Sequence, residues 1–501
     1  MGEQSTELSD PVRSTGNAEL DYILGGGLTP ASFYLIEGDP GSGKTTLALE
    51  FILEGVRSGE KTLYIALSES EIDLRRIARS HGWELDGVQI VDLTVGEEAL
   101  SSDEQSTMYH PSEIELGEVT RSILEEVKRS QADRIVIDSV AEIRRLSNSS
   151  IRYRRQLMAL KSFFRGRKNT VLLLDDRMEA EDLDLQAVAR GTITLERRSP
   201  DYGRVRRRLQ ITKMRGQRIH TGYHDFVIES GGLEIFPRMI AWEKAGASEE
   251  EVFSSRIDSL DRLLGGGIER GTCTLVMGAA GTGKSSICSQ YAVAAAQRGE
   301  KAFIWVFDEA AGNFLRRCDG LGLPLRKYRE EGLIKLRQVD PAELSPGEFA
   351  WAVRNSVEDD GAGLIVIDSL NGYLSSMPDE EYLKGQFHEL STYLNQRGVT
   401  TLATMSQHGL VGEGVVSPVE TSYLADTIVL LRFFEYAGEV RKAISVVKKR
   451  TGGHETAIRE LAFDAGGMRI GEPLKEFQGV LTGMPEYRGK GDPLLKSRDH
   501  D

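Results

Sequence analysis

The stretch FYLIEGDPGSGKTTLALEF, residues 33–51, decides the fold of the first half of the chain. A short apolar run is followed by the pattern Gly-x-x-x-x-Gly-Lys-Thr at residues 38–45, and a helical pattern comes next. In such an arrangement the turn directs successive backbone N–H groups inward, and the helix adds the positive end of its dipole. The stretch therefore predicts a phosphate-binding loop (P-loop) between a buried strand and a helix.

The same arrangement occurs a second time. GDPGSGKTTL begins at Gly38 and GAAGTGKSSI begins at Gly278, an offset of 278 − 38 = 240 residues. The upstream segments LDYILGGGL and LDRLLGGGI keep this offset, whereas RIVIDSV with Asp138 and LIVIDSL with Asp368 are 368 − 138 = 230 residues apart. A constant order with one ten-residue slip indicates a duplicated domain, and extra polar sequence at 96–113 is a plausible place for the insertion.

Each copy alternates short apolar runs with helical patterns. We expect strands at TLYIAL, RIVIDS and TVLLLDD in the first copy and at KAFIWVF, LIVIDS and TTLATMS in the second. This alternation predicts an α/β fold with mostly parallel central sheets covered on both faces. The expected organisation is a tail at 1–11, a domain at 12–240, a linker at 241–254, a second domain at 255–485 and a flexible tail at 486–501.

Composition limits the class of protein. The chain has 501 residues, 40% of them hydrophobic and 28% charged, with a net charge of −15. No apolar run is long enough to span a bilayer, and the N-terminus has no secretory pattern, so we expect a cytoplasmic protein without membrane segments. The three cysteines show no metal-binding spacing and are expected to be free, buried thiols.

The two loops supply candidate nucleotide ligands. Lys44 and Lys284 provide a cation for the β- and γ-phosphates of ATP, and the hydroxyls of Thr45 and Ser285 are placed to bind Mg²⁺. The complete set of candidates is Gly41, Ser42, Gly43, Lys44, Thr45 and Thr46 in the first copy, and Gly281, Thr282, Gly283, Lys284, Ser285 and Ser286 in the second.

Acidic residues follow two of the expected strands in each copy. Asp138 and Asp368 end the runs IVID, at the carboxyl edge of the sheet where ligands of open α/β folds bind, so we expect them to hold the Mg²⁺ shell. An aspartate that only caps the next turn is the alternative. Glu69 in ALSESE, and Asp308 and Glu309 in VFDEAA, are candidates for the group that orients a water or accepts a proton.

The tandem P-loops, the GGGL segments, the IVIDS runs and KMRGQR together resemble the KaiC family of RecA-like clock ATPases. The resemblance covers roughly residues 12–485, and YHPSEIELGE and FQGVLTGMPEY are similar to segments of KaiC-like proteins outside the best-known clock systems. It implies two RecA-like domains and a homohexamer of two rings with ATP between neighbouring subunits. It also implies slow ATP hydrolysis in the first ring, autokinase activity in the second ring of true clock members, and KaiB-like or other regulatory protein partners.

The resemblance also implies a set of cations that face the phosphates of the neighbouring subunit. In this sequence they fall on Lys213 and Arg215 in KMRGQRIH, and on Lys448, Arg450 and His454 in KKRTGGH. The histidine position of the first copy holds Ile219, and His220 comes one residue later. Such residues would complete the site against the charge of a triphosphate, as arginine fingers do.

Two positions depart from the family. Its paired glutamates become Ser68-Glu69 in the first copy and Asp308-Glu309 in the second, so hydrolysis in the first ring should be weak if the first acid does the chemistry. Its adjacent serine and threonine phosphoacceptors align with Ser422 and Tyr423 in VETSYLADTIVLL. A two-site phosphorylation cycle is therefore not expected. Ser422 alone is the candidate phosphoacceptor, and a serine that serves only as a turn hydroxyl is the alternative.

Two other functions fit the same motifs. The first is a nucleotide-gated ring that recruits regulators with little turnover. The second is a DNA-associated RecA-like ATPase, but the net charge of −15 argues against it, and the basic segment RVRRRLQITKMRGQR leads directly into the candidate cations of the ATP site. Nucleic acid is thus not an expected partner.

Overall fold

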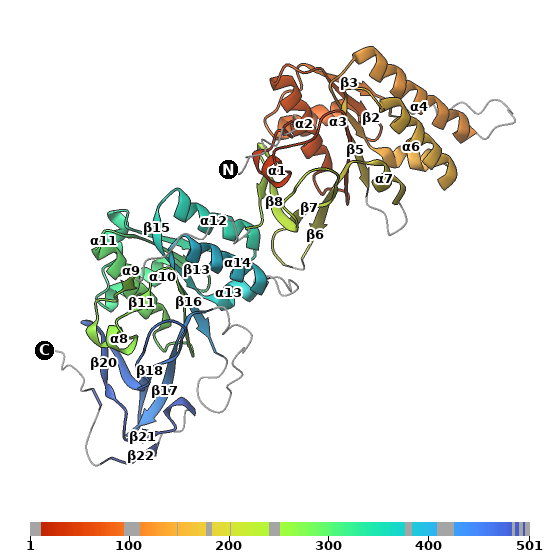
Figure 1. Ribbon diagram of the computed structural model, residues 1–501. Coiled ribbons are helices and arrows are strands. Elements are labelled where there is room, and N and C mark those ends of the chain that lie inside the picture. Colours follow the sequence, from red (N-terminus) through yellow and green to blue (C-terminus); the bar gives the residue numbers. More distant parts are fainter. Residues whose placement is uncertain are drawn as a thin grey trace, which may run out of the picture. The chain divides into compact units, whose positions relative to one another are not determined.

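The computed structural model describes residues 12–94, 111–147, 149–176, 183–200, 202–239, 251–375, 383–407, 425–482, 486–489 and 494–495. The chain divides into two compact units, residues 1–238 (unit 1) and 239–501 (unit 2). Each unit is an α/β fold with helices on both faces of one large sheet, so the predicted fold class is confirmed (Figure 1).

The described part of unit 1 contains one nine-stranded sheet in the order β3-β2-β4-β5-β1-β6-β7-β8-β9. The first six strands in this order run parallel, and β7, β8 and β9 continue the sheet antiparallel. The strands are β1 (Phe33–Gly38), β2 (Thr62–Ala66), β3 (Val88–Asp92), β4 (Arg134–Asp138), β5 (Thr170–Asp176), β6 (Gly191–Arg198), β7 (Arg206–Met214), β8 (Tyr223–Glu229) and β9 (Gly232–Phe236).

Two apolar clusters pack against the faces of this sheet. One includes residues of α1 (Ala18–Ile23), α2 (Lys44–Arg57) and α3 (Glu71–Ser80). The other includes residues of α4 (Pro111–Ser130), α5 (Val140–Leu146), α6 (Ser150–Phe164) and α7 (Leu183–Val188). The central strands β2 and β4 are buried along their whole length, as a parallel sheet between two helical layers requires.

Unit 2 repeats this plan with the strand order β14-β13-β15-β16-β12-β17-β18-β19-β20. Its strands are β10 (Val252–Phe253), β11 (Ile268–Glu269), β12 (Cys273–Gly278), β13 (Lys301–Val306), β14 (Ile334–Gln338), β15 (Ala362–Asp368), β16 (Thr400–Ser406), β17 (Thr427–Tyr436), β18 (Glu439–Lys449), β19 (Arg459–Asp464), β20 (Gly467–Pro473), β21 (Phe477–Gln478) and β22 (Glu486–Tyr487). Its helices are α8 (Asp258–Leu263), α9 (Lys284–Gln297), α10 (Ala311–Gly320), α11 (Leu325–Glu330), α12 (Pro346–Glu358), α13 (Leu370–Ser375), α14 (Leu383–Gln396) and the 3₁₀ helix η3 (Val480–Thr482). All six strands expected from apolar runs are present in the two units.

Segments expected outside the domains also belong to unit 2. Val252–Phe253, in the expected linker, forms β10 and pairs with β11. Glu486–Tyr487, in the expected tail, forms β22 and pairs with β21, and Leu494 is buried in the small cluster around Phe434 and Phe477.

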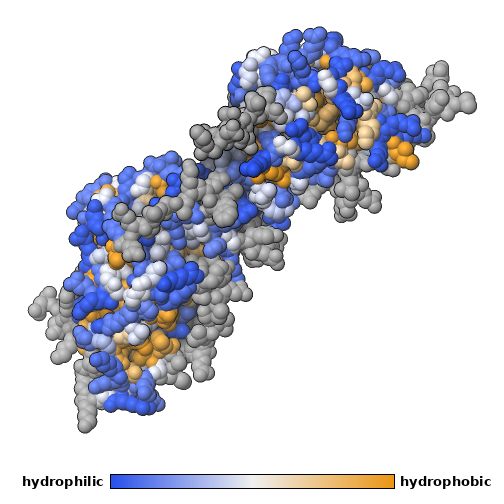
Figure 2. Space-filling model, in the orientation of Figure 1, coloured by the Kyte–Doolittle hydropathy of each residue, from blue (hydrophilic) through white to orange (hydrophobic). Residues whose placement is uncertain are grey.

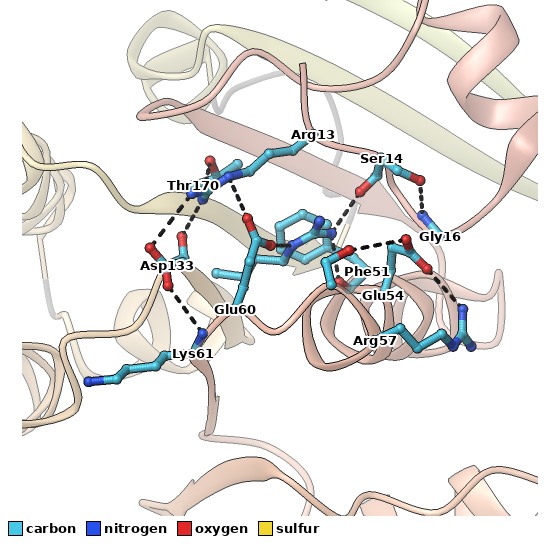
Figure 3. Close-up of polar contacts among 12 residues, drawn as sticks. Arg13, Ser14, Gly16, Phe51, Glu54, Arg57, Glu60, Lys61, Asp133 and Thr170 are labelled. Carbon is cyan, nitrogen blue, oxygen red and sulfur yellow. Dashed lines mark hydrogen bonds and ion pairs between the residues drawn. The ribbon is translucent and has the colours of Figure 1, made fainter. Parts of the chain in front are cut away.

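Partly buried ion pairs anchor the start of unit 1. Glu60, just before β2, binds Arg13 at 3.1 Å and also binds Arg134, whose side chain is buried. Arg13 in turn donates to the carbonyl of Asp133 and to Thr170 (Figure 3). These contacts hold the chain before α1 against strands β4 and β5.

Hydrophilic residues dominate the visible face of each unit, with smaller apolar patches between them (Figure 2). Among the described residues, no helix combines the length and the hydropathy that crossing a bilayer requires. The three cysteines are free and buried, as expected.

Glu50 gives unit 1 a pH-dependent stability. It lies buried on α2, its Oε1 accepts a 2.7 Å hydrogen bond from the Leu233 N–H, and burial raises its pKa to about 7. Because the folded-state pKa lies above the ordinary value of 4.5, the free energy of unfolding decreases as pH rises from 4.5 to about 7. The repeat places Gln290 at the same position of α9 (50 + 240 = 290).

We therefore expect Glu50→Gln to raise the free energy of unfolding of unit 1 by on the order of 2 kcal/mol at pH 8 and by much less at pH 5. Urea unfolding at the two pH values measures this difference. Glu234→Gln, at an exposed position of β9, is the control and should change neither value. Equal effects of Glu50→Gln at both pH values would contradict the argument.

Candidate functional site

Both units carry the predicted P-loop at the carboxyl end of the central strand. Helices α2 and α9 begin at Lys44 and Lys284, and their N-cap residues Gly43 and Gly283 have a φ of 109° in each case. A Cβ on Gly43 would lie 2.9 Å from Ile228 Cδ1, and one on Gly283 would run into the Phe463 ring. Glycine is required at these positions both by the left-handed backbone and by the close packing of the last strands of each sheet.

The remaining candidate residues of the two loops have matching exposure and backbone conformation in the two units. Gly41 and Gly281 are exposed with positive φ, whereas the side chains that follow them, Ser42 and Thr282, are buried. Thr46 and Ser286 are buried in the first turn of α2 and α9. The Ser42 hydroxyl has no hydrogen-bond partner.

The two loop lysines are folded over their own loops. Lys44 Nζ donates to the carbonyls of Gly38 at 2.7 Å and Asp39 at 3.1 Å, and lies 3.0 Å from Asp176. Lys284 Nζ makes the equivalent bonds, at 2.9 Å each, to Gly278 and Ala279. Both ammonium groups are thus held at the mouth of the loop.

A hydroxyl and a carboxylate meet beside the unit 1 loop. Thr45 Oγ1 donates to Asp138 Oδ2 at 3.2 Å, and the Tyr64 hydroxyl donates to the same oxygen at 2.6 Å. Burial raises the pKa of Asp138, although both hydrogen bonds and the Lys44 charge oppose this effect. Such a pair of oxygen ligands suits Mg²⁺, which keeps several waters and takes further oxygens from phosphate. Among the described residues there is no group of three or more His, Cys, Asp or Glu that would form an all-protein metal site.

Unit 2 positions its aspartate differently. Asp368 Oδ1 accepts a hydrogen bond from Thr404 Oγ1 on the neighbouring strand β16, and Ser285 lies in the first turn of α9. The sequence did not point to Tyr64 or Thr404, because contacts between side chains on adjacent strands depend on strand order and register.

The three candidate acids have distinct surroundings. Glu69 is exposed after β2, and burial together with the charges of Asp138 and Asp73 raises its pKa. Glu309 lies 2.9 Å from Arg317 of α10. Asp308 instead accepts a hydrogen bond from Ser369, the residue after Asp368.

The pKa of the Lys284 ammonium depends on burial and on the charges of nearby acids. Burial lowers the pKa of Lys284, and the negative charges of Asp368 and Asp308 oppose this effect. In unit 2, Asp308 is hydrogen-bonded to Ser369, next to Asp368, whereas Glu309 is paired with Arg317.

The expected cations Lys213 and Lys448 lie far along their sheets from their own loops. Lys213 pairs in register with Thr192 near the start of β6, and its Nζ donates at 2.8 Å to the carbonyl of Ala189, before that strand. Lys448 Nζ donates at 2.7 Å to the equivalent carbonyl of Ala425. Both ammonium groups thus point to the amino edge of the parallel strands, away from the P-loop at the carboxyl edge.

The other expected cations continue along this amino edge. Arg215 is exposed, and Arg450 lies 3.2 Å from Asp426. His454 is half-buried. The backbone N–H of His220 donates to Ile23, as that of Glu455 donates to Leu263, so the position of His454 in unit 1 is held by Ile219. Ser422, the predicted phosphoacceptor, and Tyr423 lie outside the described residues.

Comparison with known proteins agrees with this geometry. A family model described as "ATPase: KaiC" matches residues 13–240 and 253–475. The chain is 27% identical over 507 residues to the circadian clock protein KaiC3 of Synechocystis sp., covering 98% of each chain. It is 26% identical to the circadian clock oscillator protein KaiC of Synechococcus elongatus, covering 93% of this chain and 90% of that protein.

Two α/β units, each with a P-loop and an acidic residue at the carboxyl edge of its sheet, define a tandem P-loop NTPase. The family match extends over most of both units. The chain belongs to the KaiC ATPase family.

Proposed function

We propose that the protein is an ATP-hydrolysing homohexamer in which each ATP is held between two subunits. The observation that carries this proposal is the position of Lys213 and Lys448 at the sheet edge opposite their own P-loops. A cation there does not reach the phosphates of its own unit, but it can complete the site of a neighbouring copy. Lys213 and Arg215 would serve the first ring, and Lys448, Arg450 and His454 the second.

Each residue then has a definite task. Lys44 and Lys284 turn from their loop carbonyls to the β- and γ-phosphates. Thr45 with Asp138, and Ser285 with Asp368, would hold Mg²⁺, which neutralises phosphate charge when bound. The incoming cations complete the clamp around the γ-phosphate.

The acids that follow β2 and β13 would orient the attacking water or accept a proton. In unit 1, Glu69 orients the attacking water, and its raised pKa brings it closer to the range in which a general base works. In unit 2 the contacts favour Asp308 over Glu309, because Asp308 is hydrogen-bonded to Ser369, next to Asp368, whereas Glu309 is paired with Arg317. Self-phosphorylation at Ser422 is the proposed second activity, with Asp308, assisted by Glu309, accepting the hydroxyl proton.

Phosphate release from Mg·ATP tests these roles. We expect Glu69→Gln to reduce unit 1 turnover, and Asp308→Asn to reduce unit 2 turnover, each on the order of 100-fold. Lys284→Ala and Lys44→Ala backgrounds, respectively, isolate the unit under study. Glu309→Gln should have a smaller effect than Asp308→Asn, and the reverse order would make Glu309 the base. Wild-type rates in all three variants would exclude these acids.

Peptide mass spectrometry of the same reactions tests the kinase proposal. Phosphate should appear on the peptide that contains Ser422 in the wild-type chain and be absent after Ser422→Ala. Phosphate release without any phosphopeptide would leave hydrolysis as the sole activity. A ring that binds ATP but shows neither reaction would correspond to the nucleotide-gated recruiter of regulatory proteins.

A further inference from the structure

A basic cavity lies at the amino edge of the unit 1 sheet. Its volume is about 640 Å³, and we define it by the four cationic side chains among its lining residues, Lys161, Arg165, Arg190 and Arg215. Lys161 is in the last turn of α6, Arg190 comes directly before β6, and Phe33 begins β1. The apolar part of the wall includes Phe33 and Phe164, whose rings meet edge to face at 5.0 Å.

The positive charge of this cavity is not neutralised by the part of the chain that the structure describes. None of the described lining residues is acidic. Arg190 Nε is buried and makes no hydrogen bond. The neighbouring Lys213 has a lowered pKa, caused by burial and by the charges of Arg215 and Lys161. Concentrating cations in this way costs free energy unless an anion binds there.

The internal repeat supplies a comparison within the same chain. Val171 pairs with Phe33 as Thr401 pairs with Cys273, an offset of 401 − 171 = 230 residues. The buried apolar positions of α6, at 153, 157, 160 and 164, correspond under this offset to the buried apolar positions of α14, at 383, 387, 390 and 394. Ser391 and Asn395 of unit 2 therefore occupy the positions of Lys161 and Arg165.

The third position carries opposite charges in the two units. Gly191 pairs with Tyr34 as Thr427 pairs with Thr274, an offset of 427 − 191 = 236 residues. Asp426 therefore stands at the position of Arg190, and it pairs with Arg450 at 3.2 Å. In unit 2, Asp426 neutralises Arg450, the residue that corresponds to Arg215. In unit 1, Arg215 shares the cavity with three further cations.

We propose that the basic cavity of unit 1 is a phosphate-binding site for a nucleoside polyphosphate, and that unit 2 has no counterpart. Arginine side chains bind phosphate oxygens in pairs, and a ligand with several phosphates matches several cations. The volume suits a nucleotide, and the phenylalanine wall offers a surface for a base.

The phosphates can come from two sources. One is a nucleotide taken directly from solution. The other is the ATP on the P-loop of a second copy, and in that case the inference rests on the proposed function and adds Lys161, Arg165 and Arg190 to its cations.

A charge reversal tests the site. Arg190→Asp installs the residue of unit 2, and Arg155→Asp makes the same charge change at an exposed position of α6 that does not line the cavity. Calorimetry with inorganic tripolyphosphate is carried out on the full chain with both loops disabled by Lys44→Ala and Lys284→Ala. If the anion binds from solution, this chain binds it, and Arg190→Asp weakens binding on the order of 10-fold while Arg155→Asp does not.

The second source is tested in the chain carrying Lys284→Ala alone, with Mg·ATP as the probe. If the cavity binds the nucleotide of a second copy, Arg190→Asp weakens binding on the order of 10-fold here, and the loop-disabled chain binds no tripolyphosphate. Equal behaviour of Arg190→Asp and Arg155→Asp in both chains would overturn the proposal.

One further measurement and one further variant complete the test. Thermal unfolding checks that Arg190→Asp is folded, and Lys161→Ser, which also installs the unit 2 residue, should weaken binding in the same direction. The proposed function fails on a different measurement, namely if the wild-type chain stays monomeric with Mg·ATP.

Discussion

Replacing Lys44 and Lys284 together by alanine is expected to weaken ATP binding on the order of 100-fold or more and to abolish hydrolysis. Each ammonium is buried and held at the mouth of its loop by two carbonyls, 2.7 and 3.1 Å away in unit 1 and 2.9 Å away in unit 2. No other described cation takes this position at the start of α2 or α9. If ATP joins the subunits, sizing with and without nucleotide should also show that the variant no longer assembles.

The repeat offers a matched control for this experiment. Lys61 and Lys301 also correspond across the 240-residue offset, and both are exposed just before or at the start of the second strand of their sheets. The double change Lys61→Ala and Lys301→Ala removes the same charge and should leave ATP binding, hydrolysis and assembly unchanged. Unaltered binding in the Lys44→Ala, Lys284→Ala chain would contradict the assignment of both loops.

Arg215→Ala is expected to lower hydrolysis by unit 1 on the order of 1,000-fold, as loss of an arginine finger does. The change should affect turnover more than ATP affinity, because the finger acts on the charge that develops at the γ-phosphate. The rate is measured in the Lys284→Ala background, so that only unit 1 contributes. Lys168→Ala, at an exposed position after α6, is the control.

Mixing two chains with inactive unit 1 sites shows whether Arg215 acts across a subunit border. One chain carries Lys44→Ala and the other Arg215→Ala, both together with Asp308→Asn, so that unit 2 still binds ATP but contributes little turnover. If the arginine serves a neighbour, some borders in mixed rings combine an intact loop with an intact finger, and activity returns. If it served its own subunit, every site would keep one defect and mixing would restore nothing.

Much of the fold was predictable from local sequence patterns. Apolar runs such as TLYIAL and LIVIDS predicted strands that the structure confirms, because residues buried on both faces of a parallel sheet must be apolar throughout. The P-loops were recognisable because a turn that presents backbone N–H groups requires glycine and lysine at fixed local spacing. The antiparallel pairing that extends each sheet, from β7 to β9 and from β18 to β20, was not predicted, since strands such as β7 and β20 are half-exposed and less regular in pattern.

The sequence by itself therefore determined the duplication, the two loops, the α/β class and the family, since all of these depend on residues close together along the chain. Only the tertiary structure decided that Tyr64 donates a hydrogen bond to Asp138, that Ser369 donates one to Asp308, and that Arg190 gathers with Lys161 and Arg215. These contacts join residues on strands and helices far apart in sequence. They follow from strand order and register, which no local spacing specifies.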